Sequence, residues 1–232
     1  MTTLEAVKVK SLRKKPLLPY KYEDRLRLPA YLRVRATFED FIELSIECDY
    51  KVEYSNGDVV SIFETDLNNK NILMGNASLT HEEIVGNIIF ALNLLFRGDS
   101  SYHIHGSNTQ TFVAENIATY NPDAVVVKGA KETRLYKYNK KTQTCLTNPW
   151  LVVEVLSQGT KEYDLVEKFN RYKDIASLQQ IIFIEQYWRE VKTYIRHSDN
   201  DWLFIKQTEK LTTIPVANGF VALEDIYQKI EY

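Results

Sequence analysis

Two apolar segments and the stretch between them constrain the fold more than any other part of this sequence. The first, "PWLVVEVLS", predicts a strand at 150–156, and the second, "QIIFIEQ", predicts one at 180–186. A helix is expected between them, near 162–175. Two apolar strands joined by a helix predict a crossover unit, so part of the sheet should be parallel. Apolar residues at consecutive positions also indicate that the first strand is covered on both faces.

Further strands and helices are expected around this unit. Two hydroxyl residues have an acid three residues later and predict helix starts: Thr37 with Asp40, and Thr80 with Glu83. Asn56-Gly57 between β-rich runs predicts a hairpin. Other strands are expected at 101–106, 109–114 and 123–128, then a closing hairpin in "EVKTYIR" and "WLFIKQ", then a short final helix in "LEDIYQKI". The predicted class is α/β (or α+β), with a mixed central β-sheet flanked by helices.

Composition and charge narrow the class of protein. Hydrophobic residues make up 44% and charged residues 26% of the 232 residues, which is typical of a soluble globular protein. We expect no membrane association, because no apolar stretch approaches the roughly 20 residues that span a bilayer. The two cysteines lie far apart, and we see no secretory signal, so we expect a cytoplasmic protein. Residues 1–30, with three prolines and many bases, are expected to form a basic, extended N-terminal arm, and residues 31–232 a single domain.

The first apolar strand contains a carboxylate, Glu154, at its centre. A buried unpaired carboxylate is expensive, so Glu154 must be neutral, paired or bound to a cation. A second acid, Asp123, opens an earlier strand directly after Pro122. If the two strands are adjacent, both carboxylates meet at one sheet edge. There they could share a hard divalent cation, most naturally Mg²⁺, which prefers oxygen ligands.

The expected helix after Glu154 offers a cation for the same site. Asp164, Lys168 and Tyr172 are four residues apart and share one helix face. If that face looks at the sheet edge, Lys168 can stabilise the negative charge that develops during phosphodiester hydrolysis. The alternative, equally open at this point, is that Lys168 is a solvated residue in an ion pair with Asp164.

The ordered set "PD…EVLS…T…YD…K…Y" resembles the PD-(D/E)xK nuclease superfamily. More closely, it resembles the restriction-endonuclease-like proteins of the Uma-two type. The resemblance runs from "TFEDFIEL" through "YSNGDVV", "THEEIVGNI" and "NPDAVVV" to "PWLVVEVLSQGTKEYDLVEKFNRY" and "IIFIE", which is roughly residues 37–195. It implies a restriction-endonuclease-like fold. Fold alone does not settle function, because one fold can host several activities.

The resemblance also implies roles for individual residues. Asp123 matches the acid of the Pro-Asp motif and Glu154 the second acid, and together they would hold the metal, with the backbone carbonyl of Val155 as the third ligand. The usual lysine two residues after the second acid is absent, because Leu156 stands there. Lys168 fits the place of a lysine that has moved to the following helix. The remaining candidates are expected to have at most supporting roles: Glu53, His81, Lys161, Asp164 and Tyr172, of which Lys161 is the rival lysine.

The first hypothesis is therefore a nuclease dependent on Mg²⁺ (or Mn²⁺) that hydrolyses phosphodiester bonds, with DNA as the expected substrate. Asp123, Glu154 and Lys168 are its expected catalytic residues, and the resemblance implies a homodimer. The alternative is a nucleic-acid-binding or regulatory protein that has a nuclease fold and no significant catalysis. A third reading is a metal-dependent hydrolase of small phosphate esters.

Two further features have alternative readings. The basic stretch at 128–141, with six bases and one acid, could hold phosphates or could be a solvated loop. His103 and His105 alternate onto one face of a strand and could bind zinc. With no third ligand at a recognisable spacing, an ordinary half-exposed strand is favoured.

Overall fold

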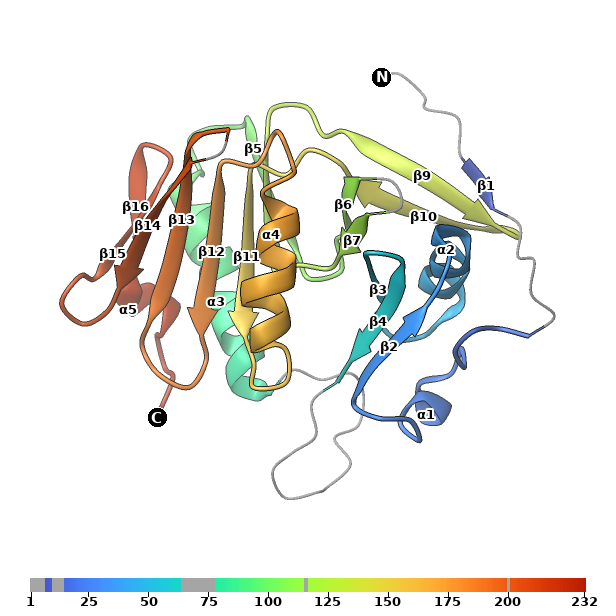
Figure 1. The fold of residues 1–232 in the computed structure, drawn as a ribbon. Coiled ribbons are helices and arrows are strands. Elements are labelled where there is room, and N and C mark those ends of the chain that lie inside the picture. Colours follow the sequence, from blue (N-terminus) through green and yellow to red (C-terminus); the bar gives the residue numbers. More distant parts are fainter. Residues whose placement is uncertain (1–6, 10–14, 64–77, 115–116, 200) are drawn as a thin grey trace. The chain divides into compact units, whose positions relative to one another are not determined.

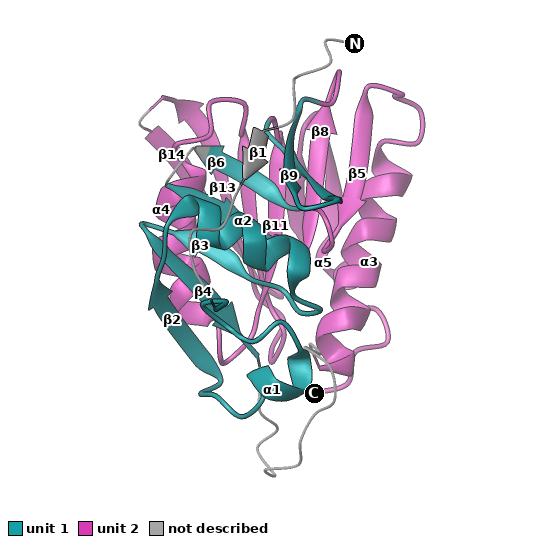
Figure 2. Cartoon of the chain, turned by 90° about the vertical axis from the view of Figure 1, so that its right-hand side faces the viewer, with its two compact units in different colours: residues 1–76, 110–121, 132–147 teal, residues 77–109, 122–131, 148–232 magenta. Residues whose placement is uncertain are grey.

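The structure, a computed structural model, describes residues 7–9, 15–63, 78–114, 117–199 and 201–232. These residues fall into two compact units (Figure 2): one is drawn from the ranges 1–76, 110–121 and 132–147, the other from 77–109, 122–131 and 148–232. Both contain mixed β-sheets and helices. The predicted α/β class is thus confirmed, and two large sheets form where one central sheet was expected. The single domain expected for residues 31–232 stays a prediction.

The first unit is built on an eight-stranded mixed sheet. In spatial order its strands are β1 (Val7–Val9), β9 (Thr133–Tyr138), β10 (Lys141–Leu146), β6 (Thr111–Ala114), β7 (Ala118–Tyr120), β3 (Glu53–Ser55), β4 (Asp58–Ile62) and β2 (Tyr31–Arg35). Its helices are α1 (Tyr22–Arg25) and α2 (Phe38–Glu47). The aromatic side chains of Phe38, Phe41 and Tyr54 lie in its core.

Two local predictions in this unit are confirmed. Thr37 caps α2, and its hydroxyl accepts from the Asp40 amide while the Asp40 carboxylate accepts from the Thr37 amide. The β3–β4 hairpin turns at Asn56 and Gly57, whose φ angles of 53° and 85° require residues that tolerate the left-handed region.

Other parts of this unit differ from the expectation. The basic stretch 128–141 holds β9, which pairs with β10 in an antiparallel hairpin, so it is not an open loop. Within β9, Arg134 lies on the same face as Tyr136, 5.5 Å from the centre of its ring, and Lys137 lies on the opposite face. The described part of the expected arm contains helix α1 and buries Leu18 and Arg25, so it is not simply extended. Residues 1–6 and 10–14 lie outside the described residues.

The second unit is built on a six-stranded sheet. In spatial order its strands are β14 (Asp201–Gln207), β13 (Val191–Ser198), β12 (Gln180–Glu185), β11 (Leu151–Leu156), β8 (Ala124–Lys128) and β5 (Tyr102–Gly106). A separate hairpin joins β15 (Thr213–Val216) and β16 (Gly219–Ala222). The helices are α3 (Leu79–Leu95), the π-helix η1 (Tyr163–Lys168), α4 (Phe169–Tyr172) and α5 (Leu223–Ile226).

The predicted crossover lies at the centre of this sheet. β11 and β12 are parallel neighbours and every residue of both strands is buried. Helix α3 covers one face of the sheet, and η1 with α4 covers the other (Figure 1). On that second face Phe169 of α4 packs against Phe183 and Tyr194. Because both faces are covered, the strands need apolar residues at consecutive positions, which explains the sequence pattern.

The start of α3 is corrected by the structure. Thr80 was expected as its N-cap, but Ser78 occupies that position and its hydroxyl accepts from the His81 amide at 3.1 Å. A serine satisfies an orphan amide without a reciprocal carboxylate, so the helix begins two residues earlier than the capping-box pattern indicated. Among the residues that the structure describes, no helix is long and apolar enough to span a membrane.

Candidate active site

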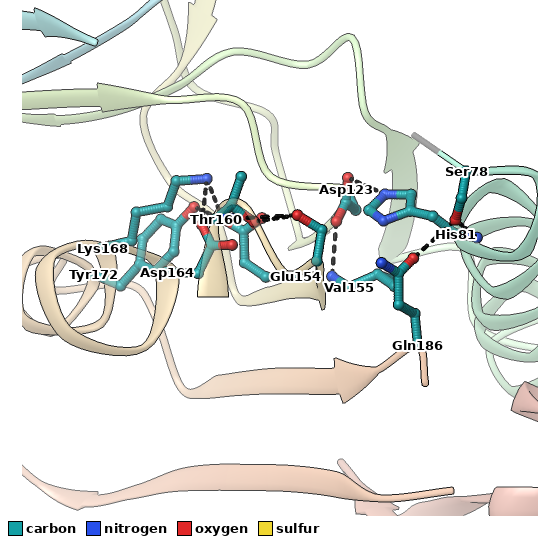
Figure 3. A network of polar contacts seen from close by, with 11 residues as sticks. Ser78, His81, Asp123, Glu154, Val155, Thr160, Asp164, Lys168, Tyr172 and Gln186 are labelled. Carbon is teal, nitrogen blue, oxygen red and sulfur yellow. Dashed lines mark hydrogen bonds and ion pairs between the residues drawn. The ribbon is translucent and has the colours of Figure 1, made fainter. Parts of the chain in front are cut away.

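Adjacent antiparallel strands bring the two predicted carboxylates together. Ala124 of β8 lies opposite Val153 of β11, so Asp123 and Glu154 are the next pair along the two strands. The Asp123 amide donates to the Val153 carbonyl at 3.0 Å and continues the strand pairing. Residues opposite each other point to the same face of a sheet. Figure 3 shows the two side chains next to one another.

The Asp123 carboxylate is held at both oxygens. Oδ1 lies 3.2 Å from Nε2 of His81, and Oδ2 accepts from the Val155 amide at 2.7 Å. Burial alone would raise the pKa of Asp123. The hydrogen bond and charge of His81, the Val155 amide and the positive charge of Lys168 outweigh it and lower the pKa below its ordinary value. At neutral pH the Asp123 carboxylate is therefore ionised, and its two oxygens are held in fixed positions.

Glu154 is buried, and the structure identifies partners for its charge. Nζ of Lys168 lies 3.2 Å from its Oε1, and the hydroxyl of Tyr172 donates to the same oxygen at 2.6 Å. Only 3% of Glu154 and 6% of Lys168 is exposed. Glu154 was expected to be neutral, paired or bound to a cation, and the structure shows it paired with Lys168.

Lys168 ends a π-helical turn that also contains Asp164. Its Nζ also lies 3.0 Å from Oδ1 of Asp164, four residues earlier. The intervening turn is a π-helix, in which the Phe169 amide donates to the carbonyl of Asp164, five residues back. The ion pair with Asp164 thus exists together with the contact to Glu154. Because Lys168 is buried, it is not a solvent-exposed residue that pairs with Asp164 alone.

Of the five other candidates, three belong to this site and two have partners elsewhere. Tyr172 and Asp164 belong to the cluster around Glu154, and His81 contacts Asp123. Lys161, the rival lysine, forms an ion pair with Glu185 at 2.7 Å. Glu53 belongs to the first unit, where it accepts from the Asn121 amide at 2.7 Å.

Three residues near the site were missed by the sequence analysis. Ser78 caps α3 and donates to Oε1 of Gln186 at 3.0 Å, which ties the His81 turn to the end of β12. Glu185, the last residue of β12, is 1% exposed. The signal for Glu185 was present, because it ends an apolar strand just as Glu154 interrupts one.

No group of three or more His, Cys, Asp and Glu side chains gathers closely enough to hold a metal ion within the described part of the chain. His103 and His105 lie on β5, at one side of the second unit's sheet. The pKa of His105 is lowered, chiefly by burial and then by the charges of Lys131 and His103.

The mixed sheet, the paired carboxylates and the helical lysine define the architectural class to which this chain belongs: an α/β protein built like the nuclease-fold proteins. The chain belongs to the Uma2 family, whose description is "Putative restriction endonuclease" and whose model matches residues 38–226. The family resemblance of the sequence is thereby confirmed.

Two relatives and one solved structure are similar to this chain. The chain is 28% identical over 167 residues to the uncharacterized protein sll1609 of Synechocystis sp. (strain ATCC 27184 / PCC 6803 / Kazusa), covering 72% of this chain and 84% of that protein. The uncharacterized protein slr1290 of the same organism is 28% identical over 137 residues, covering 58% and 64%. A crystal structure of a putative nuclease belonging to DUF820 from Anabaena variabilis ATCC 29413 has a TM-score of 0.54 at 14% identity, covering 88% of this chain and 96% of that chain. At that identity the likeness concerns the fold alone.

Proposed function

We propose that this protein is a metal-dependent nuclease that hydrolyses phosphodiester bonds, with DNA as its substrate. The observation that carries the proposal is the convergence of Asp123, Glu154 and Lys168 on one face of the β8–β11 pair, with Lys168 buried 3.2 Å from Glu154. A lysine sealed in an apolar interior beside two carboxylates is expensive to keep. Perturbed, buried charges of this kind are common at functional sites.

The donor set fits Mg²⁺ or Mn²⁺. Asp123 and Glu154 would hold the ion through carboxylate oxygens, and the backbone carbonyl of Val155 is the proposed third ligand. Mg²⁺ is commonly held by one or two carboxylates while it keeps several waters, so two acids suffice. The Val155 amide already points to the Asp123 side of β11, and in a strand the carbonyl of the same residue points the same way. When bound, such an ion neutralises phosphate charge and lowers the pKa of a water.

The surrounding side chains would prepare the site for this chemistry. Lys168 would stabilise negative charge on the phosphoryl oxygens, and Asp164 holds its ammonium group in place. Tyr172 fixes the orientation of Glu154, and His81 together with the Val155 amide fixes that of Asp123. Each proposed ligand therefore has a defined position before substrate binds.

The test is nicking of supercoiled plasmid DNA in Mg²⁺ or Mn²⁺. Asp123→Asn keeps the shape of the side chain but removes its charge, and we expect at least about a hundredfold loss of cleavage, as for other removed electrostatic groups. Lys168→Ala should lose a similar amount. Asp201→Asn, which changes an exposed acid at the start of β14, is the matched control and should cleave like the wild type. Equal nicking by all four proteins would show that the activity is a contaminant.

Metal binding can be measured without activity. Mg²⁺ or Mn²⁺ that binds the folded state stabilises it by about 2.7 kcal/mol at a hundred times its dissociation constant. A thermal-unfolding series should therefore show a rise in Tm with the metal for the wild type and for Asp201→Asn, and none for Asp123→Asn. A rise that is the same for all three would remove Asp123 from the ligand set.

A binding protein without catalysis is the second candidate, and two observations favour it. Glu154 already has an internal cation in Lys168, and Leu156 stands where the superfamily usually has its lysine. This candidate predicts gel shifts of DNA without cleavage in any metal. We also propose a homodimer, for which the mass in sedimentation equilibrium is the direct measurement.

A further inference from the structure

A second cluster of charges lies on the same face of the second unit's sheet as Asp123 and Glu154. Oε1 of Glu185 lies 2.7 Å from Nζ of Lys161 and 3.0 Å from Nζ of Lys192. Glu190, in turn, pairs with Lys192 at 3.2 Å and with Lys206 at 2.7 Å. We call these five residues the lysine cluster. Three ammonium groups face two carboxylates, so the cluster carries a net positive charge.

An exposed aromatic pair accompanies the lysine cluster. Tyr187 and Trp188 follow β12 in its turn to β13 and are 50% and 46% exposed. Nζ of Lys161 lies 4.5 Å from the centre of the Trp188 ring. This places a half-exposed indole beside ammonium groups. It is the combination that single-stranded nucleic acid binds, because bases stack on the ring and phosphates bind the cations.

The strand register connects this cluster to the candidate active site. Glu154 lies beside Phe183 of β12, and Glu185 is two residues further along the same strand. Lys192 lies beside Phe183 on the other side, and Lys206 beside Lys192, so one row of residues runs across the sheet. From ordinary strand spacings, the Cα atoms of Glu154 and Glu185 are about 8 Å apart. A strand of nucleic acid bound at one cluster would reach the other.

We propose that Trp188 stacks an unpaired nucleobase while Lys161 and Lys206 bind the adjoining phosphates, so that the protein engages single-stranded nucleic acid beside the proposed scissile bond. The inference rests on the proposed function for the role of this binding, although the binding itself does not require catalysis. The base must be unpaired, because in a duplex both of its faces are covered by neighbouring bases. Lys161 and Lys206 are the exposed lysines of the cluster, with 35% and 49% of their side chains open to solvent.

The first test measures binding in EDTA, where no divalent cation supports cleavage. The affinities of fluorescein-labelled dU and rU twelve-mers and of a duplex of the same length are compared by anisotropy. Trp188→Ala should weaken binding of the single strands about tenfold and leave duplex binding unchanged. Trp188→Phe should restore most of the affinity, and Phe220→Ala, which removes an exposed aromatic on β16, should bind like the wild type. The twelve-mer that shows the larger loss identifies the preferred sugar.

The second test follows the phosphate contacts through salt. For single strands, each phosphate contact contributes about 0.7 to the slope of log K against log salt. Lys206→Gln should reduce the slope by about that amount, and Lys210→Gln, a nearby exposed lysine, should not. Wild-type affinity of Trp188→Ala for the single strands, or equal losses for single strands and duplex, would overturn the inference. Absence of cleavage with single-strand binding intact would instead count against the nuclease proposal alone.

Discussion

Glu154 on β11 and Glu185 on β12 are both buried carboxylates near the carboxyl ends of neighbouring parallel strands. Their partners differ in exposure. Lys168, which pairs with Glu154, has 7% of its side chain exposed, whereas Lys161, which pairs with Glu185, has 35%. Glu154 also accepts a hydrogen bond from Tyr172, and Glu185 has a second lysine in Lys192. We call Glu154, Lys168, Asp164 and Tyr172 the closed cluster. The lysine cluster is exposed to water on one side, and we refer to it below as the open cluster.

This difference indicates what each cluster can do. A closed ion pair loses the hydration of both charges, so its groups are fixed and changing either one is costly. Fixed groups suit a site where charge develops during a reaction. A pair open to water keeps part of its hydration and can exchange a carboxylate for another anion, such as a phosphate, at little cost. The comparison therefore supports the two proposals, which place chemistry at the first cluster and substrate binding at the second.

The largest loss of stability is expected for a variant that removes the lysine of the closed cluster, compared with one that removes a lysine of the open cluster. Lys168→Met should lower the free energy of unfolding by about 3 kcal/mol, because it leaves two buried acids, Glu154 and Asp164, without their cation. Lys161→Met should lower it by less than about 1 kcal/mol, because Glu185 keeps Lys192. Urea unfolding at pH 7 measures both.

The double variant Glu154→Gln/Lys168→Met serves as the control. Removing the carboxylate together with its cation should recover part of the lost stability, since fewer unpaired charges stay buried. Losses of equal size for Lys168→Met and Lys161→Met would contradict the distinction between a closed and an open cluster.

Most of the closed cluster could be predicted from the sequence. The consecutive apolar residues of β11 and β12 predicted buried parallel strands, because a strand covered on both faces needs that pattern. The spacing of Asp164, Lys168 and Tyr172 predicted a shared helix face, and Lys168 and Tyr172 do both contact Glu154. The π-helix was beyond prediction, since one extra residue in a turn leaves the local pattern of apolar and charged residues almost unchanged.

The open cluster was harder to predict because its members are distant in sequence. Glu185, Lys192 and Lys206 are brought together by the pairing of β12, β13 and β14, and no single strand determines the register of a sheet. Similarly, β9 carries polar residues at its exposed positions, so the stretch 128–141 was compatible with a solvated basic loop. The start of α3 was placed at Thr80 because Glu83 completes a capping box with it, whereas Ser78 caps the helix through its hydroxyl alone.

The next largest loss of stability is expected from changing Tyr172, the uncharged partner of Glu154. Tyr172→Phe removes a hydrogen bond of 2.6 Å to a buried carboxylate and should cost about 1.5 kcal/mol of unfolding free energy. Tyr187→Phe, a half-exposed tyrosine beside the open cluster, should change stability by less than about 0.5 kcal/mol. Both are measured by urea unfolding. If Tyr172→Phe is as stable as the wild type, Lys168 alone suffices to compensate Glu154.

The smallest effect lies in the open cluster and depends on pH. Burial would raise the pKa of Glu190, but hydrogen bonds and charges from Lys206 and Lys192 lower it overall. Burial would lower the pKa of Lys192, but Glu185 and Glu190 raise it overall. A carboxylate whose pKa is lowered by folding contributes stability above its unfolded pKa of about 4.3, and this is lost as the pH falls through the folded value.

Glu190→Gln should therefore be less stable than the wild type by at most about 1 kcal/mol at pH 7, and the difference should shrink as the pH falls below about 4.3 through the lower pKa of the folded state. Urea unfolding measured at pH steps from pH 7 down to about pH 3 follows the change. On the alkaline side, the contribution of Lys192 is complete below its unfolded pKa of about 10.4 and is lost only as the pH rises through the higher folded value, so it does not alter the acid limb. A difference that stayed constant from pH 3 to pH 7 would mean that Glu190 acts by packing. The open cluster would then lack the exchangeable charge that phosphate binding requires.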